Sequence, residues 1–188
     1  MTPTQVVLLG LLATTATASY FDVRTRHIPN RMLVATGSVG VALHFGAYAV
    51  LAHEAGGDWL AAAGSAAANI AAGVLVCAFV PVLLFRFGAM GGGDVKLLAV
   101  VGALSGPVLG AQIELYAFLL AALYAPLRLA FQGQLLRLLG NSAVLVTNVF
   151  LPKERRRPLP TELLSELCFA PSVLASTVLV AFLRWGSR

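Results

Sequence analysis

The chain has 188 residues, of which 59% are hydrophobic and only 11% charged, and it carries a formal net charge of +5 with a mean hydropathy of +0.85. A soluble domain usually has about 25% charged residues, because its surface must face water. The composition therefore excludes an ordinary soluble domain, a disordered chain and a nucleic-acid-binding module, and it predicts an all-α polytopic membrane protein.

The first apolar stretch covers residues 3–21 and ends near Ala16-Thr17-Ala18-Ser19, which resembles a signal-peptide cleavage site. The basic segment that precedes the apolar part of a signal peptide is missing, because residues 1–5 contain no Lys or Arg. The positive charges follow the stretch instead, at Arg24 and Arg26. We therefore expect an uncleaved first membrane span whose C-terminal end lies in the cytoplasm.

Further stretches are long enough to cross the roughly 30 Å of bilayer hydrocarbon. They lie near residues 32–52, 59–85, 95–111, 113–131 and 167–184. We expect the boundary between the fourth and fifth spans at Ser105-Gly106-Pro107 or slightly later. The segment 135–151 is apolar but contains Arg137 and Asn141-Ser142, which favours an amphipathic helix in the interface over a crossing.

The loop charges predict how these spans are oriented. With about six transmembrane helices and an external N-terminus, the 13 Lys and Arg side chains all lie on the cytoplasmic side except Arg184 and Arg188. The loop at 53–58 has no Lys or Arg and falls outside. We expect a single integral-membrane domain over residues 1–188, with an interfacial or cytoplasmic segment at about 132–166.

Cysteine and histidine point to no metal ion and no cofactor. Cys77 and Cys168 lie in separate apolar runs without a CxxC pair, and His27, His44 and His53 form no cluster. We expect the two cysteines to be buried as small apolar side chains.

Acidic side chains at membrane depth are rare and commonly functional. Glu114, near an outer helix end, and most other carboxylates are expected to be solvated. Asp22, at the inner end of the first span, and Asp94, at the inner start of the fourth, differ from them. Since the second and third spans separate Asp22 from Asp94, both are expected on the cytoplasmic face.

Three glycines, Gly91-Gly92-Gly93, directly precede Asp94. Consecutive glycines permit unusual backbone angles and the close approach of a neighbouring backbone. They would place Asp94 at an N-cap-like position, where helix N–H groups stabilise a negative charge.

Two carboxyl groups that share one proton can hydrolyse a peptide bond, because one removes a proton from water while the other donates to the substrate carbonyl. Two other interpretations stay open. Asp22 and Asp94 could form an ion or proton relay in a transporter or secretion-apparatus subunit, or they could simply end and cap helices. Their expected position at one face, rather than in a chain across the bilayer, argues against the relay.

These segments resemble the type IV prepilin peptidases, which are intramembrane aspartyl proteases of the GxGD type. The resemblance rests on Asp22 with Ile28-Pro29-Asn30 after it, on Gly91-Gly92-Gly93-Asp94 with Lys96 after it, and on Phe169-Ala170-Pro171-Ser172 at the last span. It implies that Asp22 and Asp94 are catalytic and that Gly91 and Gly93 shape the turn holding Asp94.

The resemblance also covers three supporting residues. Lys96 matches the basic residue that follows the GxGD aspartate, and its partner stays open among the substrate, Asp22 and a lipid phosphate. Pro29 and Asn30 match the break before the second span, where we expect a turn residue and an N-cap.

Longer members of the family carry paired CxxC motifs after the first span and also N-methylate the pilin. This sequence has no CxxC motif, so it resembles the short forms of Flp/Tad pilus systems, and no methyltransferase activity is expected. The implied substrate is a prepilin-like protein with a basic leader and a hydrophobic N-terminal helix, cut on the cytoplasmic side after a glycine. Membrane lipid is the other expected partner, nucleic acid is not, and the oligomeric state is left open.

Overall fold

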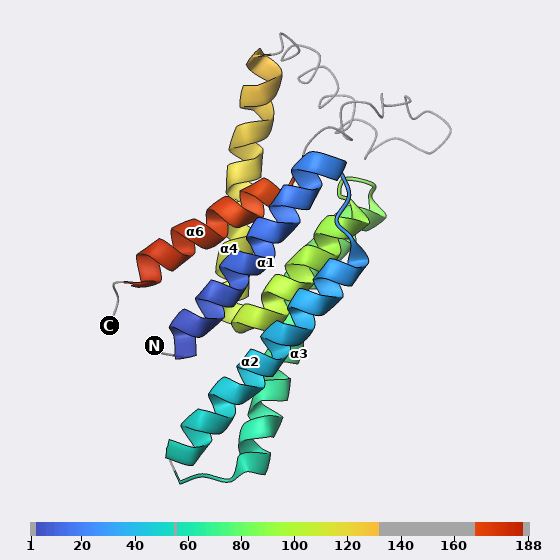
Figure 1. Ribbon diagram of the computed structural model, residues 1–188. Helices are drawn as coiled ribbons and strands as arrows, with labels where there is room; N and C mark the ends of the chain where they lie inside the picture. The colour runs from blue at the N-terminus through green and yellow to red at the C-terminus, as the bar shows by residue number, and fades with distance from the viewer. Residues whose placement is uncertain (1–2, 55, 132–167, 186–188) are drawn as a thin grey trace. The chain divides into compact units, whose positions relative to one another are not determined.

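The computed structural model describes residues 3–54, 56–131 and 168–185. These residues form the helices α1 (Pro3–Thr25), α2 (Asn30–Glu54), α3 (Trp59–Arg86), α4 (Gly92–Phe131) and α6 (Ala170–Trp185), with no strand among them (Figure 1). The expectation of an all-α protein is confirmed. The segment expected at the membrane interface, at about 132–166, lies outside the described residues.

Four of the described helices are long and apolar enough to cross a membrane. These spans are Gln5–Thr25, Asn30–Val50, Trp59–Arg86 and Gly92–Leu127, and Ala170–Arg184 is a shorter apolar helix. The chain is therefore a membrane protein with several spans, and about six crossings are compatible with these helices.

Helix α4 is interrupted at Gly106, where φ is 73° and ψ is 177°. Glycine reaches this positive φ without steric cost, and the extended ψ suits a residue that precedes a proline. The ribbon of α4 changes direction in its yellow-green part (Figure 1). The break coincides with the boundary predicted at Ser105-Gly106-Pro107.

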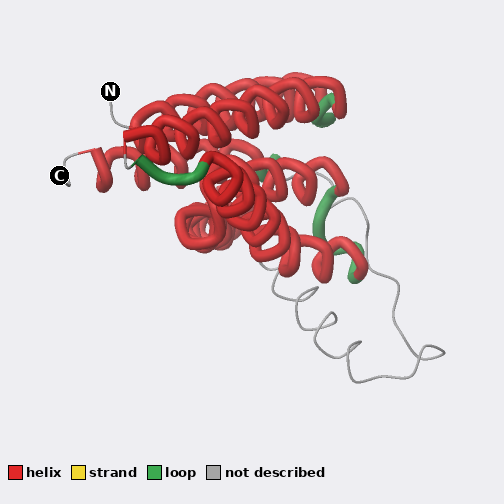
Figure 2. Tube along the Cα trace, turned by 90° about the horizontal axis from the view of Figure 1, so that it is seen from below, coloured by secondary structure: helices red, strands yellow, loops and turns green. Residues whose placement is uncertain are grey.

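The chain divides into two compact units, residues 1–118 with 168–188 and residues 119–167. The first unit contains α1, α2, α3, the beginning of α4, and α6. Within it α1 packs against α2 and α6, and α2 packs against α3. Short loops, drawn in green in Figure 2, lead from α1 to α2 and from α3 to α4. The core includes Leu11 of α1, Leu97 of α4 and Val180 of α6, all fully buried.

Helices α3 and α4 touch through their backbones. A Cβ atom built on Gly73 would lie 2.0 Å from the carbonyl oxygen of Gly102, and one built on Gly102 would lie 2.2 Å from the carbonyl oxygen of Gly73. Small residues of this kind let membrane helices approach closely and gain packing contacts. The pair therefore fixes the approach of α4 to α3.

Glu114 differs from the expectation. Its side chain is only 6% exposed and accepts a hydrogen bond from the thiol of Cys77, while its Oε1 has no hydrogen-bond partner within the described part of the chain. The expected solvation is wrong, because the segment after Gly106 turns Glu114 toward α3. Cys77 is buried, as expected, but the same expectation is wrong for Cys168, which is only half-buried just before α6.

Candidate active site

Asp22 lies in the last turn of α1, where its side chain is only 8% exposed. Its Oδ2 accepts a hydrogen bond of 3.2 Å from the backbone N–H of Ala170, the first residue of α6. The first N–H groups of a helix have no partner within that helix, and they mark the positive end of its dipole. The start of α6 therefore orients the Asp22 carboxyl and favours its negative charge.

The chain turns sharply just after Asp22. Arg26 adopts a left-handed backbone conformation with φ of 52°, and its N–H donates to the carbonyl oxygen of Asp22 at 2.9 Å. This bond is the left-handed cap that ends many helices, although glycine usually occupies the position. The thiol of Cys168 lies 3.7 Å from the same carbonyl oxygen. The turn leads directly to Ile28, which is 3% exposed.

Asp94 is the third residue of α4 rather than its N-cap. The carbonyl oxygen of Gly91 accepts from the N–H groups of Asp94 and Val95 at 3.2 and 3.3 Å, and the Gly91 N–H donates to the Asp94 carboxyl. This reach back to the first backbone N–H is half of a capping box. The N-cap-like position expected for Asp94 is therefore wrong, because the helix already includes Gly92 and Gly93.

The glycines before Asp94 serve close approach rather than unusual angles. The positive-φ glycines of the described chain are Gly56, Gly88 and Gly106, so Gly91 and Gly93 have ordinary backbone conformations. A Cβ atom on Gly91 would lie 3.1 Å from Oδ2 of Asp94, and one on Gly93 would lie 3.5 Å from the Cβ of Ile28. Gly93 thus meets the turn that follows Asp22.

The two carboxyl groups are near enough for the charge of Asp22 to act on Asp94. Each carboxyl accepts a hydrogen bond from a backbone N–H at a helix start, Ala170 for Asp22 and Gly91 for Asp94. The structure thus brings together the two acids that the sequence singled out. The sequence did not predict that the N–H of Ala170 would donate to Asp22. The only signal for it was the family resemblance at Phe169-Ala170-Pro171-Ser172.

Lys96 and Asn30 join the starts of two helices. The Lys96 Nζ donates to Oδ1 of Asn30 at 2.9 Å. The carbonyl oxygen of Pro29 accepts from the N–H groups of Met32 and Leu33 at 3.1 and 3.3 Å, so the capping position of α2 falls on Pro29. Asn30 is therefore the first helical residue, with its side chain bonded to Lys96, and not the expected N-cap.

Nothing in the described part of the chain gathers three or more His, Cys, Asp or Glu side chains that could hold a metal ion. The described residues bring two carboxyl groups near each other, each hydrogen-bonded to a backbone N–H. This arrangement defines a helical membrane protein with a carboxyl pair at helix ends.

A model of the type IV leader peptidase family matches residues 9–126, which include both Asp22 and Asp94. The chain belongs to this family, and it is accordingly a membrane peptidase with pilin-like substrates. The resemblance to prepilin peptidases is thereby confirmed. No curated protein and no solved structure matches the chain at a significant level.

Proposed function

We propose that the protein is an aspartic endopeptidase that removes the leader peptide from a prepilin-like substrate, using a water molecule activated by Asp22 and Asp94. The observation that carries this proposal is that a backbone N–H at a helix start holds each carboxyl group, while Gly93, next to Asp94, lies against Ile28 of the turn after Asp22. Donors in helices are fixed before the substrate arrives, so little reorganisation is needed during the reaction.

In the proposed reaction one carboxylate removes a proton from water, and the water oxygen attacks the carbonyl carbon of the scissile bond. The other carboxyl group donates its proton to the carbonyl oxygen. The tetrahedral intermediate then collapses, the C–N bond breaks, and the leaving amine takes a proton from the pair. The hydroxyl proton of the intermediate returns to the pair as the new carboxyl product forms, which restores the starting protonation.

The supporting residues act on the position of the acids. Gly91 leaves room for the Asp94 carboxyl and donates to it. Gly93 lets the turn after Asp22 approach α4, and the hydrogen bond between Lys96 and Asn30 ties the start of α4 to the start of α2. Pro29 ends the turn that separates Asp22 from α2.

The proposed site faces the cytoplasm of a bacterial inner membrane. Arg24, Arg26 and Arg31 follow or flank the Asp22 turn, and positive charge near span ends favours the cytoplasmic side. A sequence without CxxC motifs favours the short form found in Flp/Tad pilus systems, with peptidase activity and no methyltransferase activity. In this proposal residues 1–188 act as one peptidase domain.

Leader removal from a prepilin-like substrate, followed by gel shift after co-expression, tests the proposal. Asp22→Asn and Asp94→Asn should each abolish processing while the protein stays in the membrane fraction. Asp58→Asn is the matched control, because Asp58 only caps α3 by accepting from the N–H of Leu60, and Asn is an equally good N-cap. Efficient processing by either of the first two variants would contradict the carboxyl pair.

A further inference from the structure

The break in α4 is held by polar side chains from two other helices. His44 of α2 is only 6% exposed, and its Nδ1 lies 3.3 Å from the carbonyl oxygen of Leu104, two residues before Gly106. Asn69 of α3 has its Nδ2 at 3.1 Å from Nε2 of the same imidazole ring. Both side chains lie inside candidate membrane spans, so these groups meet where lipid offers no hydrogen bonds.

These contacts fix the direction of both hydrogen bonds. A carbonyl oxygen only accepts, so Nδ1 of His44 must carry a hydrogen and donate it to Leu104. Nε2 of the neutral ring then carries no hydrogen and accepts from the amide of Asn69. A charged ring would carry a hydrogen on both nitrogens, and the amide nitrogen of Asn69 could not donate to it. The result is a donor chain that runs from Asn69 through His44 to Leu104.

The donor chain satisfies a need that the break creates. A helix leaves its last carbonyl oxygens without partners in its own backbone, and in a membrane the protein must supply the missing donors. The first part of α4 ends at Gly106, and Pro107 after it has no N–H. His44 therefore caps the first part of α4 from a neighbouring helix.

Glycines give these side chains the room to reach the break. A Cβ atom built on Gly106 would lie 2.8 Å from Nδ2 of Asn69, so the amide fills the space of a side chain. On α2, a Cβ atom built on Gly40 would lie 1.5 Å from Cδ2 of Leu104. Because Gly40 lies one turn before His44, α2 holds both the side chain and the carbonyl oxygen of Leu104.

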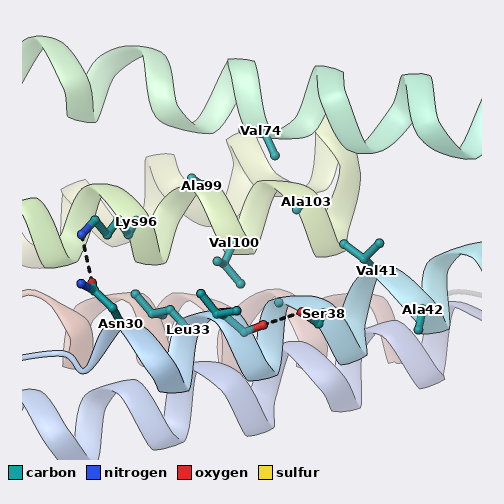
Figure 3. A pocket seen from close by; sticks show the side chains of 12 residues that line it. Asn30, Leu33, Ser38, Val41, Ala42, Val74, Lys96, Ala99, Val100 and Ala103 are labelled. Atoms are coloured by element: carbon teal, nitrogen blue, oxygen red, sulfur yellow. Dashed lines mark hydrogen bonds between the residues drawn. The ribbon is translucent and has the colours of Figure 1, made fainter.

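Helix α2 also follows the first part of α4 back toward its start. A Cβ atom built on Gly37 would lie 3.5 Å from Cγ2 of Val100, whose side chain lies between the two helices in Figure 3. Where both helices begin, Lys96 donates to Asn30 (Figure 3). Apolar contacts permit sliding along a helix axis, whereas a hydrogen bond fixes a distance and an angle. The Lys96 bond is exposed and the His44 bond is buried, so the bond at the break is the stronger restraint.

We propose that His44 and Asn69 are positioning residues for the peptidase reaction, which set the height of Asp94 relative to Asp22. The inference rests on the proposed peptidase function. Helical backbone angles are kept from the start of α4 to its break, so a displacement of Leu104 along the axis moves Asp94 by the same amount. The donor chain therefore acts on the reaction through α4.

The test separates the hydrogen bond of His44 from its bulk, using kcat and KM for leader removal by the purified protein. His44→Phe keeps an aromatic ring that can stack on Tyr48 but loses the donor, whereas His44→Asn keeps an N–H donor and loses bulk. We expect His44→Phe to lower kcat about tenfold at unchanged KM, and His44→Asn to stay within about threefold of the wild-type kcat. Asn69→Leu should also lower kcat about tenfold. Ala68→Leu, which adds the same side chain at an exposed neighbouring position of α3, should leave kcat unchanged.

A second measurement observes the donor chain directly and needs no substrate. Nitrogen NMR of the protein with labelled histidine should show His44 as a neutral ring with its hydrogen on Nδ1, and the His44→Asn spectrum identifies this signal by its absence. In Asn69→Leu the Nε2 signal should shift, because its donor is gone. A charged ring, or a hydrogen on Nε2, would overturn the donor chain.

The kinetic outcomes are distinguishable. Equal losses of kcat in His44→Phe and His44→Asn would show that bulk matters rather than the hydrogen bond, and a loss confined to KM would place the effect in substrate binding. Either result would overturn the positioning role. Wild-type kcat in His44→Phe would overturn it too and leave the peptidase function standing. A wild-type protein that removes no leader would overturn the peptidase function, while the NMR signal of His44 still decides whether the donor chain exists.

Discussion

Asp94 is oriented by its own neighbour in the chain. The N–H of Gly91 donates to the carboxyl, and the missing side chain of Gly91 leaves the space that the carboxyl occupies. Asp22 is oriented over a long sequence distance, by the N–H of Ala170. One acid therefore depends on a local turn, and the other depends on the docking of α6 against α1.

The two glycines of the GxGD motif should respond differently to alanine. In Gly91→Ala the new methyl group would lie 3.1 Å from Oδ2 of Asp94, so the carboxyl must shift by a few tenths of an ångström. Because small displacements of reacting groups are costly, we expect Gly91→Ala to lower the rate of leader removal about tenfold. Gly93→Ala meets Ile28 at 3.5 Å, an ordinary contact, and should stay within about twofold of the wild-type rate.

The measurement is the cleavage rate of one substrate at saturation, with thermal unfolding in detergent as the check on folding. Gly93→Ala is the internal control, because it adds the same methyl group to the first turn of the same helix. A larger loss of rate for Gly93→Ala than for Gly91→Ala would show that the motif acts through the Ile28 contact instead.

At the scale of the helices, the candidate site is assembled from helix ends. Asp22 lies in the last turn of α1, Asp94 lies in the first turn of α4, and Ala170 begins α6. The relative position of these ends depends on how closely the helices pack along their length. The contact of Gly73 with Gly102 is the tightest such approach on α3, because each glycine lies against the backbone of the other.

Alanine should therefore be tolerated at one glycine of α3 and not at another. In Gly73→Ala the added Cβ would lie 2.0 Å from a backbone oxygen of α4, which must move away. We expect the free energy of unfolding in detergent to fall by roughly 2–3 kcal/mol. Gly64→Ala has nothing within 4 Å and removes a flexible glycine from the same helix, so it should raise this free energy by about 0.5–1 kcal/mol. Equal effects of the two changes would contradict the backbone contact.

At the scale of the whole molecule, the sequence predicted the features that the bilayer imposes. Apolar stretches must be long enough to cross the hydrocarbon, so hydropathy alone predicted α1, α2 and α3. The break in α4 was predicted from a glycine next to a proline, Gly106-Pro107. The candidate acids were readable because charge is rare at membrane depth.

Other features depend on which helices meet, and a linear pattern does not contain that information. The burial of Glu114 against Cys77 follows from the turn at Gly106. The hydrogen bond between Lys96 and Asn30 joins residues from separate helices, so no local sequence pattern predicts it. Helix α4 begins at Gly92, two residues before Asp94. Glycine is a poor helix former, so the sequence did not indicate that Gly92 and Gly93 would belong to the helix.

The orientation in the membrane can be tested across α3. This helix has 28 residues, or about 42 Å, so its two ends should lie on opposite faces of the bilayer. Gly57→Cys and Ala89→Cys place a thiol at exposed positions beyond each end, in a background without Cys168. An impermeant maleimide should label Gly57→Cys from outside intact cells and Ala89→Cys only after the membrane is opened. Labelling of both from outside would contradict the proposed cytoplasmic site.

The central claim is that Asp22 and Asp94 act together on one water molecule, and a double-mutant cycle of kcat tests it most directly. Residues that work as one unit do not contribute additively to a rate. We predict that Asp22→Asn, Asp94→Asn and the double variant all lose about 10³-fold or more in kcat and reach the same residual rate. A single variant that keeps a substantial rate, with a double variant slower by the product of the two losses, would contradict the claim.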